Sequence, residues 1–299
     1  MRLDDLDPTS NARDLGSGGG GGGGGFGLLG LLPLLLGRGR MGCGTIAILG
    51  VVALAYFFMS SGGGGGIGTP QTAQVSAPAG SGSGNGQACD TEAELFACRV
   101  MTSTEQTWGQ IFRAQGATYR PATINFYAGR VQSGCGSATS AAGPFYCPPD
   151  QGVYLDTNFF GELSQRYGAA GDFAQAYVVA HEIGHHIQNL TGTAGEVTRA
   201  QQSVGQAEGN ALSVRLELQA DCYAGVWAAR NRSRLEPGDI EEGMRAAESI
   251  GDDTLQGQSG GTIRPESFTH GTSEQRMRWL RVGLEAGDPA ACDTFNKAI

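Results

Sequence analysis

The segment Val178-Val179-Ala180-His181-Glu182-Ile183-Gly184-His185-His186-Ile187 contains the pattern H-E-x-x-H within an apolar run. Apolar residues recur around it at three- and four-residue steps, which predicts a helix packed into a core, with Asp172 as its N-cap. Residues four apart lie on one face of a helix, so His181 and His185 can present two imidazole nitrogens to one metal. Glu182 adjoins that face and can accept a proton from water. The pattern therefore predicts a catalytic zinc site.

The distribution of histidine strengthens this prediction. The alternative is a chance match on a surface helix, because the pattern is short. The chain of 299 residues has only four histidines, and three of them fall within residues 181–186. His186 points about 100° away from its neighbour on the helix, so we expect it to be packed or hydrogen-bonded rather than a ligand.

A third ligand is expected in the stretch Leu216-Glu217-Leu218-Gln219-Ala220-Asp221-Cys222-Tyr223-Ala224-Gly225. Its apolar residues predict a second helix with one buried face. Glu217 and Asp221 are four apart and share a face. A His-His-Glu zinc site needs one carboxylate as ligand and a second that fixes a ligand histidine. We assign Glu217 as the ligand and Asp221 as its support, and the reverse assignment stays open.

These two helices belong to a longer series of motifs that occur in one order. The others are Ser133-Gly134-Cys135-Gly136-Ser137-Ala138, Gly143-Pro144-Phe145-Tyr146-Cys147-Pro148, Val153-Tyr154-Leu155-Asp156, Gly171-Asp172-Phe173-Ala174 and Ser267-Phe268-Thr269-His270-Gly271-Thr272. The series resembles the gluzincin arrangement and, more closely, the bacterial family described as putative neutral zinc metallopeptidases. The resemblance extends from about residue 88 to the C-terminus. It implies a zinc-dependent endopeptidase with a zincin-like fold and one Zn2+, but it does not identify which peptide or protein is the substrate.

The resemblance also suggests roles for His270 and Arg276. In related gluzincins a downstream histidine, followed six residues later by an arginine, lies near the zinc. Here it implies that His270 stabilises the oxyanion of the tetrahedral intermediate, with Arg276 orienting His270 or Asp221. A surface histidine is the alternative for His270. Three tyrosines, Tyr146, Tyr154 and Tyr223, compete for the oxyanion role, whereas Tyr177 and Trp227 are expected to be core residues.

Composition predicts how the rest of the chain is organised. The net charge is −9 and the pI is about 4.9, so nucleic acid is not an expected partner. Residues 1–41 are predicted to be a Gly-rich flexible cytoplasmic tail, and residues 61–87 a Gly/Ser/Pro-rich linker. Residues 42–60 carry no charge and predict a transmembrane helix. The zinc metallopeptidase domain is expected at residues 88–299.

The charges that flank residues 42–60 predict a topology. Arg38 and Arg40 precede the apolar run, and no Lys or Arg follows until Arg99. The positive-inside rule then gives a single-pass protein of the cell membrane, with a cytoplasmic N-terminus and an extracytoplasmic catalytic domain. A cleaved signal peptide is the alternative, although the polar segment before the run is long for one.

The cysteines fit an exported domain. Six of them lie beyond the apolar run, and the first four form two pairs that are close in sequence. We predict the disulfides Cys89–Cys98, Cys135–Cys147 and Cys222–Cys292, although six cysteines allow other pairings. A second metal site is the alternative, but the chain has no C-x-x-C pair.

Together these features predict an α+β fold: a zincin-like metallopeptidase domain, mainly helical with a small β-sheet, after one N-terminal transmembrane helix. Helices are expected at 92–115, 237–250 and 273–284, and strands at 122–128 and 152–156, with a short edge strand at 143–147 above the metal helix. The predicted function is zinc-dependent endopeptidase activity with Glu182 as general base. Two alternatives are a non-catalytic zinc-stabilised cell-envelope binding module and a hydrolase of non-peptide, cell-wall amides.

Overall fold

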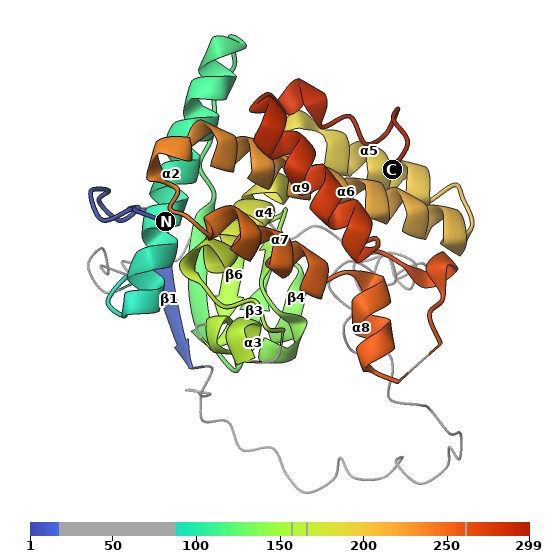
Figure 1. Cartoon of the computed structure of the whole chain (residues 1–299), viewed down its shortest axis with the longest axis horizontal. Helices are drawn as coiled ribbons and strands as arrows, with labels where there is room; N and C mark the ends of the chain where they lie inside the picture. Colours follow the sequence, from blue (N-terminus) through green and yellow to red (C-terminus); the bar gives the residue numbers. More distant parts are fainter. Residues whose placement is uncertain (18–87, 157, 166, 261) are drawn as a thin grey trace, which may run out of the picture.

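The computed structural model describes residues 1–17, 88–156, 158–165, 167–260 and 262–299. This part of the chain has an α+β fold with eight α-helices, one four-stranded sheet and a two-stranded hairpin. In Figure 1 the strands gather below α4 (Asp172–Thr191), and α6 (Gln206–Arg230) and α9 (Ser273–Ala286) lie above it. The helix that carries H-E-x-x-H therefore lies between the sheet and the other long helices, where its apolar faces are buried.

The main sheet has the strand order β1-β2-β6-β5. The strands are β1 (Ala12–Ser17), β2 (Thr123–Ala128), β6 (Gly152–Asp156) and β5 (Phe145–Cys147). The first three run parallel, and β5 pairs antiparallel with β6. Every residue of β6 is buried, as expected for a central strand with both faces covered. Strand β5 forms one edge of the sheet and packs against α4.

The remaining elements surround this centre. They are α2 (Glu92–Ala114), the hairpin of β3 (Arg130–Ser133) and β4 (Gly136–Thr139), α3 (Phe159–Gln165), α5 (Thr193–Gln201), α7 (Asp239–Ser249) and α8 (Asp252–Gln258). Capping boxes formed by Thr91 with Glu94 and by Thr272 with Gln275 fix the starts of α2 and α9. The predicted helices and strands lie close to these bounds, whereas α3, α5, α8 and the hairpin were not predicted.

Glycines allow the long helices to pack closely at two crossings. A Cβ at Gly184 would lie 2.8 Å from the Cα of Ala220, so α4 and α6 pack backbone to backbone inside the H-E-x-x-H turn. At the second crossing, Gly225 of α6 and Gly283 of α9 each meet the other helix's backbone, and a Cβ at either position would clash. These contacts bring α4 and α6, which carry the ligand candidates, and α9, which carries Arg276, close together.

All three predicted disulfides are formed: Cys89–Cys98, Cys135–Cys147 and Cys222–Cys292. The second one ties the β3–β4 turn to the edge strand β5. The third closes a separation of 70 residues and fixes the C-terminal segment to α6. The cysteines of the described residues are therefore structural.

Residues 1–17 correct the prediction of a flexible tail over 1–41. Met1, Leu3 and Leu6 are buried in the main core. Strand β1 pairs with β2, with Ala12 opposite Ile124 and Asp14 opposite Phe126. In Figure 1 this N-terminal segment runs beside α2. Residues 18–41 and the predicted linker at 61–87 lie outside the described residues.

The α-ammonium group of Met1 contacts the start of the motif helix. Its nitrogen lies 2.8 Å from both carboxylate oxygens of Asp172, the first residue of α4, and within 3.3 Å of Glu236 and Asp239. The N-cap of α4 is Gly171 rather than Asp172. The carboxylate that was predicted to cap the helix thus forms an ion pair with the first residue of the chain.

The membrane part of the predicted fold is also corrected. Among the described residues, none of the helices combines the length and the apolar character needed to cross a bilayer, and residues 42–60 lie outside this part. The predicted single-pass topology placed the N-terminus and the catalytic domain on opposite sides of a membrane. Because β1 and β2 are hydrogen-bonded neighbours, both parts belong to one folded body, and that topology is wrong.

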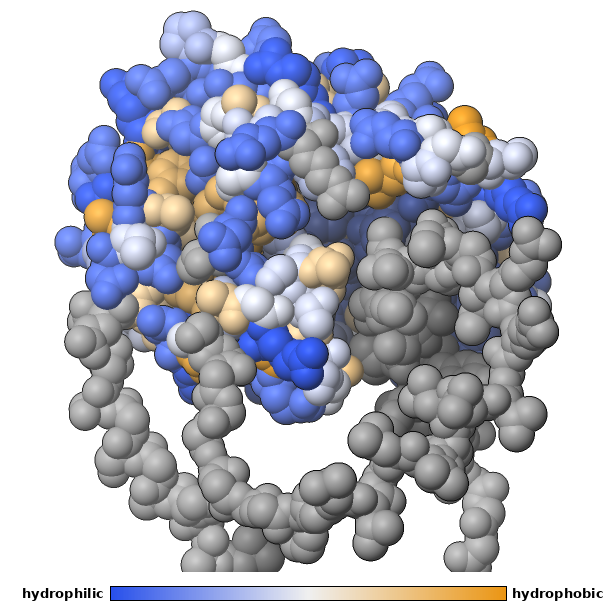
Figure 2. Space-filling view, turned by 90° about the horizontal axis from the view of Figure 1, so that it is seen from below, coloured by the Kyte–Doolittle hydropathy of each residue, from blue (hydrophilic) through white to orange (hydrophobic). Residues whose placement is uncertain are grey.

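Polar side chains enclose the core. Figure 2 shows the face seen from below, where hydrophilic residues cover most of the described surface and hydrophobic residues form small, separate patches. The exposed large hydrophobic side chains of the described residues are Leu15, Ile240 and Ile263, which lie on different segments.

Candidate metal centre

The structure brings together His181, His185 and Glu217. Helix α4 places the two imidazoles on the face that meets α6, and α6 supplies the carboxylate. The Nε2 of His181 lies 3.2 Å from Oε2 of Glu217, and the Nε2 of His185 lies 3.5 Å from its Oε1. One potential ligand atom from each residue lies within 4.8 Å of the others. The arrangement can hold one metal ion with two nitrogens and one carboxylate, the donor set of many catalytic zinc sites.

A buried network fixes the orientation of His181. Its Nδ1 lies 2.8 Å from Oδ1 of Asp221, so Nε2 is left to face Glu217. The guanidinium of Arg276 donates to both oxygens of Asp221, each at 2.9 Å, and the hydroxyl of Tyr177 donates to Oδ1 at 2.6 Å. Asp221 is fully buried, and Tyr177 and Arg276 are nearly so. Of the two acidic residues, Glu217 belongs to the group of closely spaced potential ligand atoms, whereas Asp221 contacts the other ring nitrogen of His181.

The electrostatics of the cluster suit a cation. Burial by itself lowers the pKa of His181, but Asp221 and Glu217 outweigh it and raise that pKa to about 10. Burial also raises the pKa of Glu217, but His185 and His270 outweigh it and hold that pKa well below its usual value. The cluster therefore attracts positive charge, which a divalent cation can supply in place of protons. The donor types, their spacing and this charge all fit zinc.

Glu182 lies next to the metal-ligand face and is 7 % exposed. Burial raises the pKa of its carboxyl group, although His181 and His185 partly offset this effect. A carboxylate with a raised pKa is a better proton acceptor than an exposed one. This environment suits the general-base role predicted for Glu182.

His270 lies within electrostatic reach of Glu217, and it is held by a residue that the sequence did not indicate. The carboxylate of Asp252 accepts hydrogen bonds from three successive backbone N–H groups, those of Thr269, His270 and Gly271. Its other oxygen lies 3.3 Å from Nδ1 of His270. Burial lowers the pKa of His270, but Glu217 and Asp252 outweigh it, so that pKa is raised. The loop therefore presents a side chain that favours the positively charged form.

His186 points away from the metal ligands, as predicted. Its Nε2 donates to the backbone carbonyl of Arg120 at 2.6 Å, so its Nδ1 accepts from the hydroxyl of Tyr146 at 2.9 Å. Asn189 donates to the same hydroxyl at 2.9 Å. Since Tyr146 lies on β5, these bonds attach the edge strand to the motif helix.

Two other tyrosines considered for the oxyanion role have contacts of their own. The hydroxyl of Tyr154 donates to Asp150 at 2.7 Å, and the ring of Tyr223 packs edge-on against Trp108. Tyr177, predicted to be a core residue, is buried but also bonds to Asp221. Asp252 and the polar role of Tyr177 were therefore not predicted from the sequence. A tyrosine one turn before the first histidine was the available signal for the latter.

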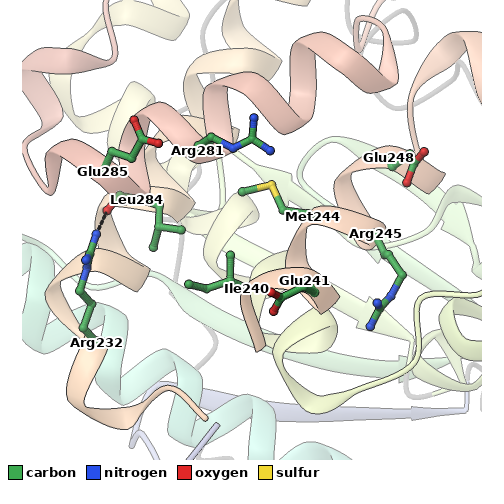
Figure 3. Close-up of a pocket in the computed structure, with 9 residues that line it drawn as sticks. All are labelled: Arg232, Ile240, Glu241, Met244, Arg245, Glu248, Arg281, Leu284 and Glu285. Atoms are coloured by element: carbon green, nitrogen blue, oxygen red, sulfur yellow. Dashed lines mark hydrogen bonds between the residues drawn. The ribbon is translucent and has the colours of Figure 1, made fainter. Parts of the chain in front are cut away.

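A separate surface groove lies between α7 and α9. Its volume is about 510 Å³, and Ile240, Met244 and Leu284 line its centre. Figure 3 shows arginine and glutamate side chains around these residues, with Arg232 bonded to the carbonyl of Leu284. None of the metal-ligand candidates lines this groove.

Comparison with known proteins places these observations in a family. The model of the family described as "Putative neutral zinc metallopeptidase" matches residues 1–295. The match includes residues 1–17, which the sequence analysis had separated from the catalytic domain.

Two similar proteins are the uncharacterized protein YpfJ of Escherichia coli (strain K12) and the uncharacterized protein Rv2575 of Mycobacterium tuberculosis (strain ATCC 25618 / H37Rv). The first is 45% identical over 260 residues, which cover 86% of this chain and 88% of YpfJ. The second is 44% identical over 217 residues, which cover 67% of this chain and 71% of Rv2575. No solved structure matches the chain.

Proposed function

The chain belongs to the putative neutral zinc metallopeptidase family, and from this premise we propose that it is an endopeptidase that uses one zinc ion. The observation that carries the proposal is the convergence of His181, His185 and Glu217 beside the buried carboxylate of Glu182. A purely structural zinc site needs four ligands and no general base. Three ligands with an adjacent base favour catalysis.

His181, His185 and Glu217 would hold the zinc, which when bound would supply Lewis-acid chemistry toward the scissile carbonyl and would lower the pKa of a water to about 7. Glu182 accepts a proton from the attacking water and delivers it to the leaving amine nitrogen as the C–N bond breaks. Asp221 and Arg276 keep the Nε2 of His181 directed at the site throughout.

His270 is proposed to stabilise the negative charge that develops on the carbonyl oxygen. A cationic group that is fixed in place needs no reorganisation as that charge appears, and the raised pKa of His270 favours its cationic form. Asp252 supports this role because it holds both the backbone and the ring of His270.

The edge strand β5 supports an extended peptide as substrate. Its outer side is free of a strand neighbour among the described residues, and Tyr146 fastens it to α4 through His186. An extended chain can add to such an edge through backbone hydrogen bonds, with little dependence on side chains. We therefore expect the enzyme to have little preference for the substrate's sequence and a strong preference for unstructured segments of its substrates.

The experiment compares wild type, Glu182→Gln and Glu196→Gln in the full chain, since residues 1–17 are part of the fold. Glu196 is an exposed residue of α5 and serves as the matched control. We expect all three to bind about one zinc, the expected stoichiometry of such a site. Cleavage of an unfolded protein should fall about 10²- to 10⁴-fold in Glu182→Gln alone, the usual contribution of a general base.

Two results would contradict the proposal in different ways. If wild type binds zinc but cleaves neither unfolded proteins nor peptides, a binding module or a hydrolase of other amides is favoured. If wild type binds no zinc at micromolar concentration, the metal site itself is wrong.

A further inference from the structure

A chain of hydrogen bonds runs from the ligand candidate His185 to the C-terminal segment. The Nδ1 of His185 lies 3.0 Å from Oε1 of Gln188, one turn further along α4. The Nε2 of Gln188 donates to Oε1 of Gln219 on α6 at 3.1 Å. The Nε2 of Gln219 donates to the carbonyl of Cys292 at 3.0 Å. We call Gln188 and Gln219 the amide relay.

The ends of this relay determine the direction of every bond in it. Gln188 also donates through Nε2 to the carbonyl of Leu216 at 2.7 Å. A backbone carbonyl only accepts, so the end of Gln188 that faces Leu216 must be its NH₂ group. Its oxygen therefore faces His185 and can only accept. Consequently Nδ1 of His185 carries a proton, and Nε2, which faces Glu217, is the ring nitrogen left to bind a metal.

We infer that the amide relay positions His185 as a metal ligand, as Asp221 and Arg276 position His181. The inference rests on the proposed metal site. Gln188 selects the ring tautomer whose Nε2 can bind a cation, and it is a positioning residue rather than a catalytic one. Neutral amides thus orient one ligand histidine and a buried ion pair orients the other.

The relay also ties the two ligand-bearing helices together beside the site. Leu216 directly precedes Glu217, so the bond from Gln188 fixes the α6 backbone next to the carboxylate ligand. The far end of the relay is anchored because Cys292 is bonded to Cys222, the residue after Asp221. Gln188 and Gln219 are 1 % and 7 % exposed. Buried amides are costly unless bonded, and here both N–H groups and the oxygen of Gln188 are used.

The test measures zinc affinity of the full chain by competition with a chelator, for wild type, Gln188→Met, Gln188→Glu and Asn125→Leu. Met matches the size of Gln but cannot accept from Nδ1. Glu keeps an oxygen toward Nδ1 but loses the NH₂ group. Asn125 is a buried amide of β2 whose side chain bonds, within the described part of the chain, to Thr123 and the carbonyl of Val153, so it serves as the matched control.

We expect Gln188→Met to weaken zinc binding about 10- to 100-fold, the usual effect of removing a partner of a ligand histidine. Gln188→Glu should recover most of that loss although its folding stability is lower, and Asn125→Leu should bind zinc like wild type. The inference would be overturned if Gln188→Met bound zinc within about twofold as tightly as wild type, because that change is much smaller than the expected loss. Wild type that binds no zinc would instead overturn the metal site.

A second measurement applies if Gln188→Met does not fold. Imidazole nitrogen NMR of the zinc-loaded wild type reports which ring nitrogen of His185 carries a proton. A proton on Nδ1 supports the relay, and a proton on Nε2 overturns it.

Discussion

Asp221 and Arg276 form a buried ion pair in which the guanidinium donates to both carboxylate oxygens, each at 2.9 Å. The pair joins α6 to α9 directly behind His181. The Nδ1 of His181 lies 2.8 Å from Oδ1 of Asp221. Burial raises the pKa of Asp221, but Arg276 and His181 outweigh it, so that pKa is lowered and the group stays a carboxylate. The orientation of His181, a proposed ligand, thus depends on an arginine that is not itself one of the ligand candidates.

Replacing Arg276 by Met should lower the free energy of unfolding by about 3–5 kcal/mol, because the carboxylate of Asp221 would remain buried without its guanidinium partner. Zinc affinity should fall as well, since His181 loses its fixed partner. Arg276→Lys should recover little, because an ammonium group cannot form the planar two-bond contact. Chemical denaturation and chelator competition measure the two effects.

The control for this prediction is the surface pair of Arg99 and Asp4, in which the Asp4 side chain is 92% exposed. Asp4→Asn should cost less than about 1 kcal/mol, as is usual for an exposed pair. A similar cost for Arg276→Met would contradict the role given to the buried pair.

Gly184 should be required for the approach of α4 and α6. A Cβ there would meet the backbone of Ala220 at 2.8–2.9 Å, so Gly184→Ala must separate the helices that carry the histidines and Glu217. We expect a loss of stability of about 1–3 kcal/mol, typical of overpacking, together with weaker zinc binding. Gly109→Ala in α2 is the matched control, because a Cβ there meets nothing within 4 Å. Gly109→Ala should stabilise the protein by about 0.5–1 kcal/mol through helix propensity. Equal changes in stability for Gly184→Ala and Gly109→Ala would contradict the close packing of α4 and α6.

The metal centre was predictable because its pattern is local. His181, Glu182 and His185 lie within one helical turn, and the spacing of Glu217 and Asp221 repeats the same geometry on α6. The strand at 152–156 was predictable because Val153 and Tyr154 are residue types that favour β-structure. Asp252 was not predictable, because its partners are backbone N–H groups of a loop 17–19 residues away.

Strand β1 was missed for a related reason. Residues 12–17 read Ala-Arg-Asp-Leu-Gly-Ser, with no apolar alternation, and the glycine run that follows extended the prediction of a flexible tail back to residue 1. The pairing of β1 is decided by β2, more than a hundred residues later, and by the burial of Met1, Leu3 and Leu6. Single-sequence patterns carry no information on such a distant partner.

Deleting residues 1–17 should therefore destabilise the catalytic domain. The deletion removes three buried apolar side chains, each contributing about 1.5–3 kcal/mol, and exposes the edge of β2. Leu3→Ala alone should cost about 2–5 kcal/mol. Leu15→Ala, at a side chain that is 45% exposed, should stay within about 0.5 kcal/mol of wild type. Urea denaturation of the three variants measures this, and a deletion as stable as wild type would show that the segment is dispensable.

Acid should loosen the attachment of β5 to α4 through His186. Burial lowers the pKa of His186 below its ordinary value of about 6.5. The unfolded chain therefore binds a proton at His186 more readily than the folded one. The neutral form of His186 thus contributes to the free energy of unfolding above about pH 6.5, and this contribution is lost as the pH falls further. Protonation would place an N–H at Nδ1, which now accepts from Tyr146.

We expect wild type to lose more stability than His186→Gln between about pH 7.5 and pH 5.5, either side of the ordinary pKa, when both are measured with chelator present. The other three histidines titrate in both proteins, so their contributions cancel in the difference. Equal pH dependence in the two proteins would show that His186 takes up its proton without disturbing the contact with Tyr146.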